Sequence, residues 1–167
     1  MTTIELETKI NASQQTCFDL ARSIDLHVQS TVSTGEKVVA GKTSGLVELG
    51  DEITWEATHF GVRQRLSVRI IEMNSYSSFT DCMVKGAFKS MNHRHSFEFR
   101  DGKTIMKDHF CYETPFGIVG RLFDFFILKK HMTRFLKIRN NMIKERAEQD
   151  GNLLLGSYPN LFHNYWG

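Results

Sequence analysis

Two histidines separated by one residue are the first candidates for chemistry in this sequence. His93 and His95 lie in the stretch NHRHSFEF (92–99), whose residue types are typical of a β-strand. Successive side chains of a strand point to opposite faces, so both imidazoles should point the same way. An imidazole can bind a metal ion, transfer a proton near neutral pH or orient a bound molecule. Which role applies depends on what that face of the sheet covers.

An acidic residue that could pair with these imidazoles lies on the next predicted strand. Asp101-Gly102 is typical of a two-residue hairpin turn, so residues 87–99 should pair with residues 103–113. Alternation in the first strand predicts one shared face: Met91, His93, His95, Phe97 and Phe99. Alternation in the second strand predicts another shared face: Thr104, Met106, Asp108, Phe110 and Tyr112. Asp108 is therefore a candidate partner for the two histidines.

Further strands and two short helices precede this hairpin. Alternating apolar residues predict a strand over residues 3–10, and Ser13 is a typical N-cap for a short helix. A second short helix is expected to begin near Ile24. The later predicted strands cover about residues 36–40, 53–59, 63–70 and 78–86. Gly61 should form a bulge or a tight hairpin between two of them.

One long amphipathic helix is predicted from Phe116 to about Glu148, roughly 45 Å in length. Its apolar residues recur at helical spacing: Ile118, Leu122, Phe125, Leu128, Met132, Phe135, Leu136, Met142 and Ile143. Its basic residues should form a solvated opposite side: Lys129, Lys130, Arg134, Lys137, Arg139, Lys144 and Arg146. An antiparallel sheet must cover its apolar face, and this helix is the largest element available. We expect Phe125 to point inward.

The layout and three local stretches resemble the START-like superfamily, also called SRPBCC or helix-grip proteins. The stretches are GKTSGLVELGDEITWEATHFGVRQRLSVRI (41–70), FTDCMVKGAFKSMNHRHSFEF (79–99), and TPFGIVGRLFD (114–124) with FLKIRN (135–140). The sequence is most similar to a bacterial branch described as polyketide cyclase/dehydrase-like or cell-division-related. The resemblance implies an α+β fold in which a curved antiparallel sheet wraps around the C-terminal helix, with two short helices after the first strand. Members bind many kinds of ligand, so the fold does not define a function.

A curved sheet around a helix tends to leave a cavity, and alternation predicts which side chains line it. The polar candidates are His59, Gln64, His93, His95 and Asp108, with Asp81 added if Phe79 and Met83 point inward. The candidates for contact with a ligand's apolar part are Trp55, Leu66, Met91, Met106, Phe110, Tyr112 and Phe125. We expect such a cavity to bind a small hydrophobic molecule, namely a lipid, an isoprenoid or an aromatic polyketide-like compound, and we expect no metal ion and no cofactor.

Three readings of the histidines remain open. Two histidines at i and i+2 with Asp108 could bind a metal, but this spacing is common and weak evidence. A buried His–Asp pair could move a proton in a cyclase or dehydratase, with His93, His95 and Asp108 as catalytic residues. The same residues could instead orient a ligand, or they could merely satisfy one another's buried hydrogen-bonding groups. A carboxylate within hydrogen-bond reach of histidines in a cavity wall would favour the enzyme. Histidines bonded only to backbone would favour binding, and the absence of a large cavity would favour a protein-interaction role.

The composition limits the remaining possibilities. The chain has 167 residues with 41% hydrophobic and 24% charged residues, which suits one globular domain, predicted over residues 1–149. A net charge of +2 does not favour nucleic acid as a partner, and no apolar run is long enough for stable membrane insertion. Three widely spaced cysteines and the lack of a signal-peptide pattern predict a cytoplasmic protein. The apolar tail, residues 150–167, should pack on the domain or on a neighbouring subunit, which leaves a homodimer open.

Overall fold

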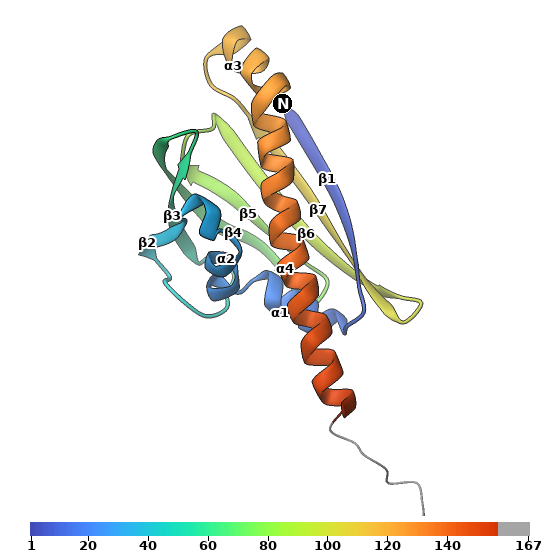
Figure 1. Cartoon of the computed structure of the whole chain (residues 1–167). Helices are drawn as coiled ribbons and strands as arrows, with labels where there is room; N and C mark the ends of the chain where they lie inside the picture. Colours follow the sequence, from blue (N-terminus) through green and yellow to red (C-terminus); the bar gives the residue numbers. More distant parts are fainter. Residues whose placement is uncertain (157–167) are drawn as a thin grey trace, which may run out of the picture.

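A seven-stranded antiparallel sheet packs against one long helix (Figure 1). The computed structural model describes the backbone of residues 1–156 and the side chains of residues 1–149. The strand order is β1-β7-β6-β5-β4-β3-β2, so the first strand lies beside the last. The strands are β1 (Thr2–Ile10), β2 (Lys37–Gly41), β3 (Glu52–His59), β4 (Val62–Asn74), β5 (Ser78–Lys85), β6 (Ser90–Arg100) and β7 (Lys103–Glu113). The predicted α+β fold is confirmed.

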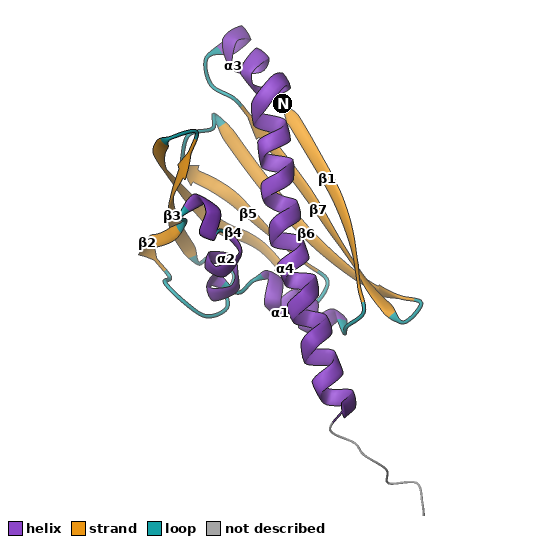
Figure 2. Ribbon diagram, in the orientation of Figure 1, coloured by secondary structure: helices purple, strands orange, loops and turns teal. Residues whose placement is uncertain are grey.

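The helices lie on one side of the sheet (Figure 2). They are α1 (Gln14–Ala21), α2 (Ile24–Ser30), the 3-10 turn η1 (Val32–Thr34), α3 (Gly117–Phe123), the π-helical segment η2 (Asp124–Leu128) and α4 (Lys129–Gly156). No helix in the described part of the chain is both long enough and apolar enough to cross a membrane.

The local structure follows from the predicted caps and turns. Ser13 accepts a hydrogen bond from the backbone N–H of Thr16, 3.0 Å away, which caps α1 as expected. Phe60 and Gly61 have φ angles of 54° and 75°, and Asp101 and Gly102 have 52° and 76°. Left-handed angles at both central residues are those of a type I′ hairpin turn, which matches the twist of the flanking strands. Of the two expectations for Gly61, the tight hairpin is confirmed.

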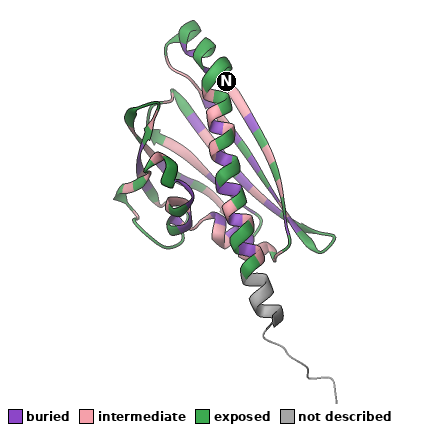
Figure 3. Ribbon diagram, viewed as in Figure 1, coloured by how far each residue is buried: buried purple, intermediate pink, exposed green. Residues whose placement is uncertain are grey.

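The core lies between the sheet and α4 (Figure 3). A buried stripe on α4 faces the strands: Met132, Leu136, Asn140, Ile143 and Ala147. At one end of the sheet, α1 inserts Phe18 against Phe79 and Phe97, with ring centroids 5.7 and 5.6 Å away. Toward the other end, the sheet and α4 are less tightly packed, and cavities lie between them.

The prediction that Phe125 points inward is wrong, because its side chain is 76% exposed. A π-helical turn holds more residues than an α-helical turn, so η2 changes which residues face the sheet. Asp124 takes the inward position and accepts hydrogen bonds from the hydroxyls of Tyr112 and Thr2. The apolar spacing from Ile118 to Leu128 therefore does not form one continuous buried stripe.

Two further predictions about the helix need correction. The sequence places Arg139 on a solvated basic side, but this residue is only 7% exposed, because its side chain extends between α4 and α1 to the carbonyl of Ala21. The helical region continues to Gly156, beyond the predicted end near Glu148. The predicted packing of the tail concerns side chains outside the described residues, and the division at residue 149 stays a prediction.

Candidate functional site

Two adjoining cavities lie between the sheet and the helices. The inner cavity has a volume of about 120 Å³ and reaches toward α1 and α2, whereas the outer cavity, of about 380 Å³, reaches toward α3. Their walls share six residues: Glu36, Trp55, Leu66, Phe88, Met132 and Phe135. The two cavities are therefore neighbouring compartments that share part of their walls.

Most of the predicted site residues line these cavities. The inner cavity is lined by Asp81, Met91, His93, His95 and Phe110, and the outer cavity by His59 and Gln64. Trp55 and Leu66 line both. Three predicted ligand contacts are not in either wall: Met106 is fully buried in the core beside α1, Tyr112 is bonded to Asp124, and Phe125 points outward.

A buried carboxylate connects the two histidines, as the hairpin predicted. Asp108 is 1% exposed, and His95 is its direct neighbour across the β6–β7 ladder. Its Oδ1 lies 3.0 Å from His93 Nε2 and 2.8 Å from His95 Nδ1, although only the His93 contact has hydrogen-bond geometry. Asn140 of α4 donates a 2.6 Å hydrogen bond to Oδ2. Asp108 therefore holds the His93 ring by a hydrogen bond and lies against the His95 ring, behind the cavity wall.

The surroundings keep His93 neutral and Asp108 ionised. Burial, with a smaller contribution from the neighbouring His95, lowers the pKa of His93 to about 4, while Asp108 partly opposes the change. Burial alone would raise the pKa of Asp108, but contacts with His93 and His95 outweigh burial and hold it well below its usual range. The arrangement is that of a neutral imidazole that donates from Nε2 to a carboxylate, which leaves its Nδ1 as a proton acceptor.

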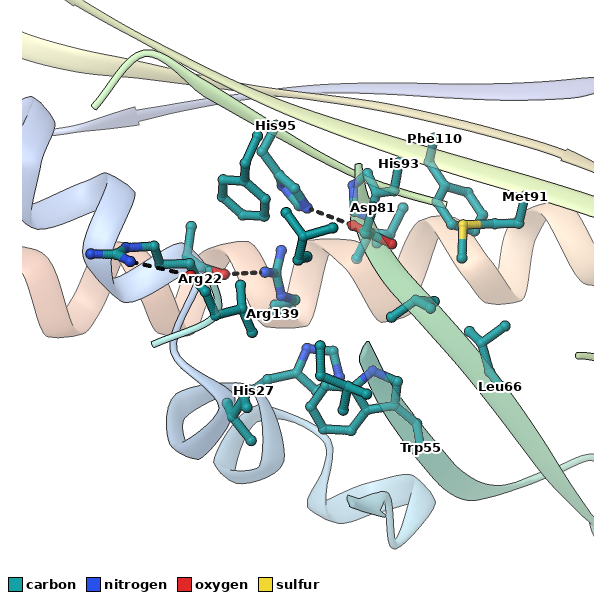
Figure 4. A pocket seen from close by; sticks show the side chains of 18 of the residues that line it. Arg22, His27, Trp55, Leu66, Asp81, Met91, His93, His95, Phe110 and Arg139 are labelled. Carbon is teal, nitrogen blue, oxygen red and sulfur yellow. Dashed lines mark hydrogen bonds and ion pairs between the residues drawn. The ribbon is translucent and has the colours of Figure 1, made fainter. Parts of the chain in front are cut away.

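Asp81 approaches the same histidines from the neighbouring strand (Figure 4). Its Oδ1 lies 3.7 Å from His95 Nε2, on the side of the ring opposite Asp108. One ligand atom each from Asp81, His93 and His95 fits within 4.8 Å, so these three residues could hold a divalent cation. The guanidinium of Arg139 lines the same cavity, and its positive charge opposes a cation there.

Arg139 is a site residue that the sequence reasoning missed. Its Nη2 donates a 2.6 Å hydrogen bond to the Ala21 carbonyl, while Nη1 is buried without a hydrogen-bond partner among the described residues. Burial lowers its pKa, whereas Asp108 and Asp81 act in the opposite direction. Leu136, Arg139, Asn140 and Ile143 follow helical spacing, and this signal could have placed Arg139 and Asn140 on the buried face.

Two other histidines in the cavity walls were also missed. His27 stacks on Trp55 with ring centroids 4.2 Å apart, and its Nε2 lies 3.2 Å from the carboxylate of Glu36. His131 Nε2 lies 3.1 Å from His59 Nδ1 in the wall of the outer cavity. His131 follows Leu128 by three residues and precedes Phe135 by four, so helical spacing could have placed it on this face, whereas His27 lies in a helix of only seven residues that offers no such pattern.

The fold recurs in solved structures of low sequence identity. The protein TTHA0849 from Thermus thermophilus is 18% identical with a TM-score of 0.71, covering 94% of this chain and 100% of that one. A START superfamily protein from Mycobacterium smegmatis is 14% identical with a TM-score of 0.65, over 88% and 97% of the two chains. Major latex-like protein 151 from Panax ginseng is 15% identical with a TM-score of 0.61, over 87% and 97%.

These likenesses, together with the topology, show that the chain has the START-like, helix-grip fold. No protein-family model matches the sequence, and neither does any curated protein. Sequence identities below one fifth show a shared fold but not a shared activity, so the function must be argued from the cavities themselves.

Proposed function

We propose that this protein binds a small hydrophobic molecule in its two cavities, with the polar end of the molecule in the inner one. The observation that carries the proposal is the outer cavity of about 380 Å³, which falls in the size range of small-molecule sites. Its wall is mainly apolar and aromatic, and it adjoins an inner cavity where polar groups converge. A molecule with an apolar body and one polar end matches both compartments.

The polar groups of the inner cavity would orient such a ligand. His95 and Asp81 come from the sheet, and Arg139 comes from the opposite side with an N–H group that has no partner among the described residues. The positive charge of Arg139 in the cavity wall would attract an electronegative oxygen at the polar end of the ligand. A cavity of this volume argues against a protein-interaction role, which the absence of a large cavity would have favoured.

A second candidate function is acid–base catalysis of a cyclase or dehydratase type. The observation that favours it is the carboxylate of Asp108 within hydrogen-bond reach of His93, with both rings in a cavity wall. His95 could remove a proton from carbon beside a carbonyl group and pass it to a departing hydroxyl, which would release water and leave a double bond. Asp108 would orient the rings in this reaction.

Native mass spectrometry of the purified protein, followed by solvent extraction, tests the binding proposal. We expect a retained molecule with an apolar body and at least one oxygen. If none is retained, titration with a hydrophobic fluorescent probe should still show saturable binding. The absence of both would contradict the proposal.

The same extract separates binding from catalysis. The molecule, once identified, is incubated with the wild-type protein and with His95→Gln, and the products are followed by mass spectrometry. His109→Gln, at a half-exposed position on β7, serves as the control. Turnover lost only in His95→Gln would establish the enzyme, whereas an unchanged molecule in all samples would leave binding as the function.

A further inference from the structure

An exposed apolar surface covers the start of the helical region. Six large apolar side chains there are each at least 56% exposed: Phe116, Ile118, Val119, Leu122, Phe125 and Phe126. We call these six residues the apolar end. They lie within eleven consecutive residues, at a tip that projects beyond the sheet (Figure 1). Contiguous exposed apolar patches of this kind usually mark a surface that contacts a partner or a membrane.

The exposure results from packing of the opposite side of the helix. Gly120 is buried so tightly that a Cβ atom there would lie 1.8 Å from the carbonyl oxygen of Pro115. Asp124 is held by hydrogen bonds from Tyr112 and Thr2. These two contacts fix which side of α3 and η2 faces the protein, and the apolar end is therefore held outward.

The apolar end borders the outer cavity. Phe116, Gly120 and Phe123 form part of the cavity wall together with Phe60 and Val62 from the β3–β4 hairpin. Phe60 and Phe123 contact each other with ring centroids 5.5 Å apart, and both are more than 40% exposed. The cavity thus reaches the surface beside the apolar end. An apolar molecule could therefore pass from the apolar end into the cavity with little contact with water.

The exposed charged side chains of residues 114–137 are all basic. Residues 114–137 contain five basic side chains and one acidic one, Asp124, which is buried. Arg121, Lys129, Lys130 and Arg134 are all exposed. In a two-fold dimer through this surface, the basic groups of one copy would face those of the other. An anionic surface is the complementary partner.

We propose that the apolar end docks peripherally on an anionic lipid bilayer, with its aromatic side chains in the interface and the nearby Lys and Arg side chains at the headgroups. Aromatic residues combined with basic ones are the usual composition of helices that lie in a membrane interface. Such docking would place the opening of the outer cavity next to the acyl chains. It goes beyond ligand binding and can be tested without knowing the ligand.

Vesicle co-sedimentation of the full chain tests the proposal. Vesicles of phosphatidylcholine alone are compared with vesicles that also contain phosphatidylglycerol, at low and high salt. We expect binding to the anionic vesicles that weakens with salt. The double variant Phe125→Ser/Phe126→Ser should bind the anionic vesicles at least roughly tenfold more weakly than wild type does. The matched control Ile71→Ser/Phe99→Ser changes two comparably exposed apolar residues, 51% and 54%, away from this end.

A charge-reversal pair gives a second readout. Lys129→Glu/Lys130→Glu should lose binding to anionic vesicles, while Lys103→Glu/Lys107→Glu, at exposed positions of β7, should retain it. Circular dichroism melting confirms that each variant is folded. Absence of vesicle binding by wild type would overturn the proposal, as would equal losses in test and control variants. Light scattering that shows a wild-type dimer converted to monomer by Phe125→Ser/Phe126→Ser would assign the surface to a second copy instead.

Discussion

The cluster around Asp108 and the apolar end are built in opposite ways. Asp108, His93 and His95 are polar groups at most 7% exposed, whereas the aromatic side chains of Phe125 and Phe126 are 76% and 68% exposed. The polar cluster is stable because its members are partners for one another and for Asn140. In the apolar end, the rings of Phe125 and Phe126 contact each other, with centroids 5.0 Å apart, but both remain exposed.

This contrast separates groups that maintain the fold from groups that are free for contacts outside it. Burying a carboxylate costs free energy unless hydrogen bonds and charges compensate it, so Asp108 is bound tightly into the structure. Exposed aromatic groups add little to folding, because their contact with water hardly changes. The four changes below test the contrast, from the largest expected effect to the smallest.

Asp108→Ala should destabilise the protein by about 3–5 kcal/mol, because His93 and Asn140 would lose their buried partner. Urea denaturation followed by circular dichroism gives the free energy of unfolding. Glu7→Ala, at a half-exposed site on β1, is the control and should stay within about 0.5 kcal/mol of wild type. Similar values for the two variants would show that the buried cluster does not stabilise the fold.

Acid should destabilise the protein through His93. Its pKa is lowered from 6.5 to about 4 in the folded state, chiefly by burial, so the unfolded state binds the proton first as the pH falls. Stability should decrease between pH 6.5 and pH 4, by about 3 kcal/mol from this group, and no further below that window. His93→Gln should flatten this part of the profile, while His109→Gln should not. Parallel profiles for wild type and His93→Gln would contradict the assignment.

Ala57→Phe should reduce ligand binding without unfolding the protein. Ala57 is buried in the wall of the outer cavity, so a phenyl ring there would occupy space that the ligand needs. Affinity for a hydrophobic fluorescent probe should fall roughly tenfold, equivalent to about 1.4 kcal/mol. Ile71→Phe places the same ring at an exposed site of β4 and should leave affinity unchanged. Equal affinities of the two variants would show that the probe binds outside the outer cavity.

Phe126→Ala should change the free energy of unfolding by less than about 0.5 kcal/mol, because its ring is already exposed. Phe97→Ala is the comparison, since its ring is 4% exposed beside α1 and its loss should cost about 3–5 kcal/mol. Both values come from the same denaturation experiment. A large loss in Phe126→Ala would show that the apolar end belongs to the core of the fold.

Much of the architecture could be predicted because local signals and long-range packing agree there. Alternation gave β7 with the observed bounds, and Asp101-Gly102 gave the turn that aligns Asp108 with His95. The helical region was harder to predict, because a π-helical turn changes which residues face the sheet and no clear sequence pattern marks such a turn. Arg139 was misplaced because a basic side chain is ordinarily solvated, and its burial depends on the carbonyl of Ala21 in a distant helix.

The sequence by itself determined the order of strands and helices, the hairpin register and the shared face of the two histidines. These features depend on residues close together in the chain, where backbone periodicity and turn geometry act directly. Only the tertiary structure decided that Arg139 enters the cavity, that Met106 and Tyr112 lie outside it, and that Phe125 and Phe126 face solvent. Each of these depends on contacts between segments distant in the chain, such as Arg139 with the Ala21 carbonyl and Tyr112 with Asp124, and local periodicity does not specify such contacts.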